Sequence, residues 1–425
     1  MQEAFLHFVW QHQYFDKKGL ATTEGLQLTV KRPGYINTDA GPDFKEGQLT
    51  IEGIDWNGSV EIHVKSSDWE QHQHQTDDAY NNVILHVVWE HNKEVKRADG
   101  TVIPVLELKN RIELTLIERY RKLINTPGLS IPCEGQFSQV NDVIKIATLD
   151  SMATERLHDK SVFIEEVLKR NKGDWEETAY QLMAKNFGLK VNAEPFQLLA
   201  ESLPFKIVKK HGSKKDEIEA LLFGMSGFLD DPVDDDYHQS LITTYQYLKH
   251  KYNLEQKLNK FRWKFLRLRP ANFPSLRIAQ FSSILTDSQS IFERFLTEDA
   301  KTLAQWLRRE PSTYWQSHYN FNSTSASKIK GIGASTFDNI IINTVAPLLV
   351  AYGKQIDNQD YIDRAITLLQ DLKAEKNRIT RIWEYLDFKP TSALDSQGQI
   401  QLYNNYCLRK NCLRCSIGTS ILQHR

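Results

Sequence analysis

Cysteine is scarce in this sequence, and neither sign of charge prevails. Only 4 of the 425 residues are cysteine, too few for the disulfide framework of a secreted chain of this length. The 53 basic and 54 acidic residues leave a formal net charge of -1. No overall field therefore draws the protein to nucleic acid or to a membrane, and any polyanion-binding site must be a local patch.

Long apolar runs and a secretory signal are also missing. The most apolar region, residues 340–352, is shorter than the roughly 20 residues that a membrane span requires. Residues 1–16 are rich in aromatic residues and histidine and lack the basic start of a signal peptide. We therefore expect a cytoplasmic protein that does not enter a membrane.

The order of helix and strand signals predicts an α+β fold. Within residues 1–127, apolar spacing and turn residues predict a helix, three strands, a helix and two further strands. Their expected ranges are 3–15, 26–30, 48–51, 59–64, 66–82, 83–89 and 101–108, with a turn at Asn57 and Gly58 between the second and third strands. Residues 128–405 read mostly as helices, and residues 406–425 form a cysteine-rich tail.

The most informative segment holds two carboxylates beside a short run of strand. Glu61, His63 and Lys65 alternate along the strand and project from one face. Asp43 precedes the previous strand and can reach that face across the hairpin. Two neighbouring carboxylates repel unless a cation lies between them, and hard oxygen ligands suit Mg²⁺ or Mn²⁺. The set suits metal-assisted phosphodiester hydrolysis, although Asp43 could instead cap a turn beside a solvated sheet face.

These residues resemble the signature of the PD-(D/E)XK nucleases. That family has Pro-Asp, a hairpin and then Glu-x-Lys, and here Pro42 and Asp43 are followed by Glu61. The resemblance implies an αβββαβ restriction-endonuclease-like domain, Mg²⁺ or Mn²⁺ as cofactor, and cleavage of DNA or RNA. It also implies a role for Glu3, since many members carry a further glutamate on the first helix. His63 stands where the family has lysine, so His63 or Lys65 would take the lysine's role.

Histidines offer a second reading of the same region. His72, His74 and His86, together with His63, could form a zinc site, because imidazoles are common zinc ligands. Three classes of function therefore stay open. They are a metal-dependent nuclease, a nucleic-acid-binding protein whose nuclease-like domain has lost activity, and a histidine-rich zinc hydrolase.

Three of the four cysteines cluster near the C-terminus. Cys407, Cys412 and Cys415 have the spacing C-x4-C-x2-C, and Cys133 stands alone. Thiolates at such spacing bind zinc or an iron–sulfur cluster. We therefore expect all four to share one metal centre. The arrangement loosely resembles that of helicase–nucleases of the AddB type, in which one distant cysteine and three C-terminal cysteines hold an iron–sulfur cluster.

Residues 256–277 carry seven basic residues, no acidic residue and several aromatic residues. Basic side chains neutralise phosphates and aromatic rings stack on unpaired bases. We expect a nucleic-acid contact here, although the aromatics could equally belong to the core. The residues predicted to bind are Lys260, Arg262, Lys264, Arg267 and Arg269.

The chain as a whole resembles an uncharacterised bacterial family of unknown function. The segments that carry this resemblance are residues 41–44, 60–63, 83–88, 269–274 and 407–418. That family brings no established function, so the expectation of a nuclease rests on the N-terminal residues.

Overall fold

In the computed structural model, which describes residues 1–125, 130–231, 233–286 and 289–423, the chain forms two compact units. Unit 1 comprises residues 1–148 and 403–425, and unit 2 comprises residues 149–402. Unit 2 is thus an insertion within the sequence of unit 1. The predicted boundary between residues 127 and 128 lies outside the described residues.

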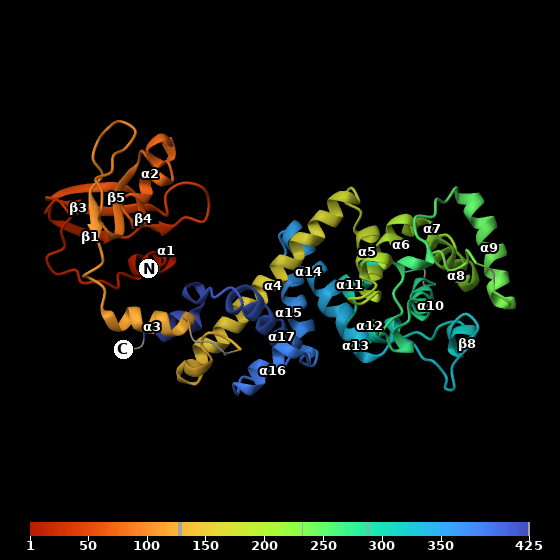
Figure 1. Ribbon diagram of the computed structural model, residues 1–425. Helices are drawn as coiled ribbons and strands as arrows, with labels where there is room; N and C mark the ends of the chain where they lie inside the picture. The colour runs from red at the N-terminus through yellow and green to blue at the C-terminus, as the bar shows by residue number, and fades with distance from the viewer. Residues whose placement is uncertain (126–129, 232, 287–288, 424–425) are drawn as a thin grey trace. The chain divides into compact units, whose positions relative to one another are not determined.

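Unit 1 is built on a mixed sheet with the strand order β1-β3-β4-β5-β6, and β2 pairs with β3 (Figure 1). Pairing is antiparallel from β1 to β4 and parallel from β4 to β6. Helix α1 packs against β4. The elements before unit 2 are α1 (Glu3–His12), β1 (Leu28–Arg32), β2 (Tyr35–Ile36), β3 (Phe44–Ile51), β4 (Ile54–Lys65), α2 (Asp68–Gln71), η1 (His74–Thr76), η2 (Asp78–Tyr80), β5 (Val83–Glu90), β6 (Val105–Glu107), α3 (Leu114–Asn125) and η3 (Glu134–Gln139).

The hairpin between β3 and β4 turns at Glu52 and Gly53, and not at Asn57 and Gly58 as predicted. Ile51 pairs with Ile54, which leaves a two-residue loop. Both loop residues have positive φ, 48° and 78°. A two-residue hairpin turn with positive φ at both positions twists with the strands and favours glycine. Asn57 and Gly58 lie inside β4 instead, so this strand is longer than expected.

The helix predicted over residues 66–82 is wrong. Only α2 forms there, and the chain continues through the short 3₁₀ turns η1 and η2. Gln73 has a left-handed backbone, with φ at 60°, which ends the helical path. Asp77 then caps the next turn by accepting the N–H of Ala79. As a result, this segment places its histidines on a turn above the sheet and not along one helix face.

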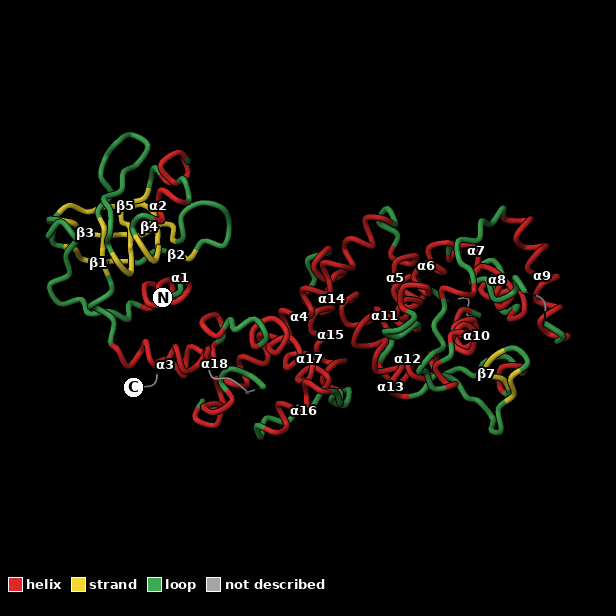
Figure 2. Tube along the Cα trace, in the orientation of Figure 1, coloured by secondary structure: helices red, strands yellow, loops and turns green. Residues whose placement is uncertain are grey.

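Unit 2 is largely helical, as predicted for this part of the chain (Figure 2). Its buried side chains form one large apolar cluster. Helix α4 (Asp142–Arg170) leads into it. The remaining elements are α5 (Trp175–Phe187), α6 (Ala193–Ser202), α7 (Phe205–Lys209), α8 (Lys215–Met225), α9 (Asp236–Tyr252), η4 (Lys260–Arg262), η5 (Pro270–Asn272), α10 (Pro274–Leu285), α11 (Ile291–Thr297), α12 (Ala300–Leu307), η6 (Tyr314–Gln316), β7 (His318–Asn320), β8 (Ser323–Thr324), α13 (Ala334–Ile340), η7 (Ile341–Val345), α14 (Ala346–Gln355), α15 (Gln359–Asp371), α16 (Arg378–Tyr385) and α17 (Ala393–Gln401).

One helix of unit 2 is long and apolar enough to cross a membrane by length and composition alone. It runs over Ala334–Gln355, longer than the apolar region at residues 340–352 suggested, because η7 joins α13 to α14. Of its apolar window, 72% is buried inside the fold. Such burial is typical of a core helix, as in a soluble protein, and a cytoplasmic location stays a prediction.

After unit 2 the chain returns to unit 1. The returning elements are η8 (Leu402–Cys407), η9 (Cys412–Arg414) and α18 (Ser416–Gln423). Helix α18 packs against α3, η3 and η9. Unit 1 is therefore formed by two segments of the chain, one before unit 2 in the sequence and one after it.

Candidate metal centre

Asp43 and Glu61 lie side by side where β3 begins opposite β4. Phe44 pairs with Val60, and this register sets Asp43 next to Glu61. The Glu61 carboxylate accepts the N–H of Asp43 at 3.0 Å, and the Asp43 carboxylate accepts the N–H of Ile62 at 3.0 Å. Glu61 is only 4% exposed. Burial raises the pKa of Glu61, and the negative charge of Asp43 raises it further.

Helix α1 adds two side chains to these carboxylates. Glu3 and His7 are one helical turn apart, and His7 Nε2 lies 3.8 Å from Glu3 Oε1 and 3.2 Å from Asp43 Oδ2. Burial and the charge of Asp43 raise the pKa of Glu3. Burial alone would lower the pKa of His7, but its contact with Asp43 outweighs this effect and the net pKa is raised. Sequence reasoning missed His7, although its spacing of four residues from Glu3 is a usable signal.

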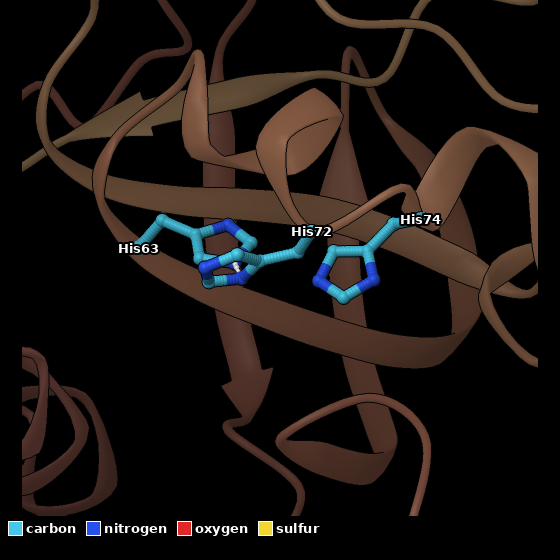
Figure 3. A group of neighbouring side chains, drawn as sticks. All are labelled: His63, His72 and His74. Atoms are coloured by element: carbon cyan, nitrogen blue, oxygen red, sulfur yellow. Dashed lines mark hydrogen bonds between the residues drawn. The ribbon is translucent and has the colours of Figure 1, made fainter.

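Three histidines gather beside Glu61. Figure 3 shows the imidazole rings of His63, His72 and His74 close together, and one ligand atom from each lies within 4.8 Å of the others. His63 Nε2 is 3.1 Å from His72 Nδ1. Glu61 Oε1 is 3.5 Å from His63 Nε2 and 3.3 Å from His74 Nε2. These residues come from β4 and from the turns after α2, so the unexpected break of the helix at Gln73 is what brings them together.

Three distances that link these residues are close to the edges of a metal coordination shell. With metal–ligand bonds of about 2.1 Å, adjacent ligand atoms lie about 3.0 Å apart at 90° and about 3.4 Å apart at the tetrahedral angle. The observed distances of 3.1 and 3.3 Å fall in this range, and the distance of 3.5 Å lies just above it. The buried Nε2 atom of His74 has its 3.3 Å contact with Glu61 but no hydrogen bond of good geometry among the described residues. A metal ion would satisfy it.

Burial favours the neutral form of two of the imidazole rings, those of His63 and His86. Burial lowers the pKa of His63 to about 3, and the neighbouring rings of His74 and His72 contribute. Burial also lowers the pKa of His86 well below its usual value. Neutral imidazole is the ligand form. His63 Nδ1 lies 2.8 Å from His86 Nε2. His86 therefore contacts His63 through the ring nitrogen that faces away from His72, and it is not part of the metal-binding group in which it was predicted.

Two aromatic side chains, one buried and one half-buried, hold the cluster in place, and sequence reasoning missed both. Trp69 is fully buried, and its ring lies 5.3 Å from that of His74 and 5.5 Å from that of His86. Its Nε1 atom donates to the carbonyl of Lys96 at 3.1 Å. Tyr80 stacks on His74 with ring centroids 3.8 Å apart. Support of this kind fixes the orientation of a ligating histidine.

Lys65 does not join the site. It lies on the same strand face as Glu61 by alternation, but it is exposed at the end of β4, where its backbone N–H donates to Asp68. In the described parts of the chain, its side chain has no ion pair or hydrogen bond with Asp43 or Glu61. Of the two residues His63 and Lys65, only buried His63 lies beside Glu61.

The basic segment in unit 2 is partly neutralised. Lys260 pairs with Asp231, and Arg262 pairs with Glu194 at 3.1 Å. Lys264, Arg267 and Arg269 are exposed. Among the interleaved aromatics, Trp263 is buried and donates to Ser226, whereas Phe261 is 84% exposed. The segment thus combines a core anchor with an exposed basic and aromatic surface.

The fold and the site define a mixed α+β protein with a histidine-rich cluster that could bind a metal. Residues 3–378 match the family model described as protein of unknown function, DUF2851. The chain belongs to that family. The matched range ends before the three C-terminal cysteines. No curated protein and no solved structure matches the chain.

Proposed function

We propose that this protein is a metal-dependent phosphodiesterase acting on nucleic acid, with its metal held by Glu61, His63, His72 and His74. The observation that carries the proposal is the grouping of the three imidazoles, with Glu61 in contact with two of them. Imidazole and carboxylate together suit Mn²⁺, Fe²⁺ or Zn²⁺ better than Mg²⁺, which takes oxygen ligands. We therefore propose Mn²⁺, Fe²⁺ or Zn²⁺ as the cofactor in place of Mg²⁺.

The arrangement of the sheet supports a nuclease over other metal-dependent hydrolases. An antiparallel hairpin is followed by a parallel strand, and the first helix carries Glu3 beside the carboxylates. This order agrees with the resemblance of Asp43 and Glu61 to the PD-(D/E)XK signature. A zinc hydrolase that cleaves ester or amide bonds would use the same ligands, so such substrates belong in the test.

Each side chain has a role in this proposal. The metal would lower the pKa of a bound water and supply the attacking hydroxide. Asp43 lies beside Glu61, where it can accept a hydrogen bond from that water or act as a further metal ligand. The contact with Asp43 raises the pKa of His7 and so favours its cationic form. A cationic imidazole at this place can stabilise the developing charge on a phosphate or protonate the leaving oxygen.

We further propose that the exposed surface at Lys264, Arg267 and Arg269 binds the nucleic-acid backbone. Phe261 is 84% exposed and Leu266 is 83% exposed in the same segment. Exposed aromatic and apolar groups beside cations suit unpaired bases, which stack on such groups while phosphates meet the charges.

The test is cleavage of single- and double-stranded DNA and RNA by the full chain with Mn²⁺, Zn²⁺, Fe²⁺ or Mg²⁺. Glu61→Gln and Asp43→Asn keep side-chain size and should abolish cleavage, since each removes a charge from the metal site. Asp55→Asn is the matched control, because Asp55 is an exposed carboxylate on the same hairpin, paired with Lys31 at 2.6 Å.

Two results would sink the proposal. One is a wild-type protein that cleaves no nucleic acid with any of the four metals. The other is cleavage that survives both Glu61→Gln and Asp43→Asn. Hydrolysis of ester or amide substrates, lost in the same variants, would instead assign the site to a zinc hydrolase of another class.

A further inference from the structure

The four cysteines of the chain bracket the inserted unit. Cys133 directly precedes η3, before the insertion. Cys407 ends η8, Cys412 begins η9 and Cys415 directly precedes α18, all after the insertion. Every one of them belongs to unit 1. The chain therefore leaves unit 1 after one cysteine and returns to it with three.

These cysteines lie in one part of the folded unit. Helix α18 packs against η3 and η9, which brings the C-terminal segment to Cys133. Cys407 lies within electrostatic range of the other three thiols, and Cys133 lies within range of Cys412 and Cys415. Cys133, Cys412 and Cys415 are buried, Cys407 is half-buried, and all four are free thiols.

The backbone around Cys415 is arranged as in a thiolate-binding turn. The N–H of Cys415 donates to the carbonyl of Cys412 at 3.2 Å, which closes the C-x2-C turn. The backbone N–H groups of Ile417 and Gly418 lie near the Cys415 sulfur. Gly418 lies so close to the backbone of Cys412 that a β-carbon would not fit. Amide donors aimed at a sulfur stabilise its anionic form, which is the form that binds metal.

We propose that Cys133, Cys407, Cys412 and Cys415 hold a four-thiolate metal centre, either an iron–sulfur cluster or a zinc ion, that closes unit 1 across the inserted unit. The role is structural. The ligands come from segments far apart in the sequence, so they are not assembled in the unfolded chain and metal binding contributes directly to folding. This centre is separate from the histidine cluster and does not depend on the proposed activity.

The test begins with metal analysis of the full chain purified without oxygen. A cluster predicts a brown protein with broad visible absorbance and about four iron per chain, and zinc predicts a colourless protein with about one zinc at this site. Cys412→Ser should lower the bound metal by about tenfold or more, in line with the loss of a ligand. Leu408→Ser is the control, because Leu408 adjoins Cys407 but is 59% exposed.

Glu61→Gln separates the two metal sites, since it should leave the cysteine centre occupied whether or not the chain is an enzyme. If Cys412→Ser does not fold, native mass spectrometry of the wild type decides alone. Bound zinc or iron and sulfide, with all four thiols protected from alkylation until a chelator is added, supports the proposal. A chain that stays metal-free after anaerobic supply of zinc and of iron with sulfide overturns it.

Discussion

Trp69→Phe should weaken metal binding at the histidine cluster, beyond what its effect on stability explains. Trp69 is fully buried, and its indole N–H donates to the carbonyl of Lys96 at 3.1 Å. Phenylalanine leaves that carbonyl unpaired, which costs about 1–3 kcal/mol, and the smaller ring leaves a partial cavity worth about 1 kcal/mol. We therefore expect a loss of about 2–4 kcal/mol in the free energy of unfolding.

The control for this variant is Trp10→Phe in the same unit. Trp10 is also fully buried, and it donates to the carbonyl of Pro33 at 3.0 Å. The two variants should lose similar stability in urea unfolding followed by circular dichroism. Only Trp69→Phe should raise the Kd for Mn²⁺ or Zn²⁺ in calorimetry, by about tenfold or more, because Trp69 is the one of these two tryptophans that contacts His74. Equal Kd values in the two variants would refute the support role of Trp69.

Three further predictions follow from the two units. Saturating Mn²⁺ at about 100 times its Kd should stabilise the wild type by about 2.7 kcal/mol but leave the thermal midpoint of Glu61→Gln unchanged, and an equal shift in both would place the ion elsewhere. Burial raises the pKa of Glu219 from 4.5 to about 7, so the stability that this side chain contributes should be full below pH 4.5 and fall by roughly 3 kcal/mol as the pH rises through 7. Urea unfolding of Glu219→Gln should show a flatter pH dependence than that of the wild type, and parallel curves would contradict this. Replacing Lys264, Arg267 and Arg269 with alanine should reduce the slope of log K against log salt by about one for each lost phosphate contact, measured by fluorescence anisotropy, whereas an unchanged slope would remove this surface from binding.

Regular patterns in the sequence were sufficient for the coarse fold. The continuous apolar run that became β5 and the alternation around Glu61 predicted strands where strands occur. The helical character of the region after residue 128 also followed from its apolar spacing. What failed was local: the turn at Glu52 and Gly53 carries no strong signature, and the left-handed backbone of Gln73 belongs to a residue type that rarely marks a helix end.

The histidine cluster shows why the site was only partly predictable. His72 and His74 were candidates for zinc by residue type, but on a helix they would point in different directions. Their convergence on His63 depends on the end of the helix at Gln73 and on the aromatic packing of Trp69. Such tertiary features have no periodic trace in the sequence. The prediction that placed Lys65 at the site had a different weakness. Strand alternation predicts which face of the sheet a side chain lies on, but not whether that side chain is buried.

The central claim is that a transition metal binds between Glu61 and the three histidines. The most direct measurement is an anomalous-difference map from crystals of the wild-type protein grown with Mn²⁺ or Zn²⁺. We predict a peak within about 2.3 Å of Glu61 Oε1 and of the ligand nitrogens of His63, His72 and His74. Peaks confined to surface carboxylates or to the cysteines, with the three imidazoles bonded only to one another, would contradict the account.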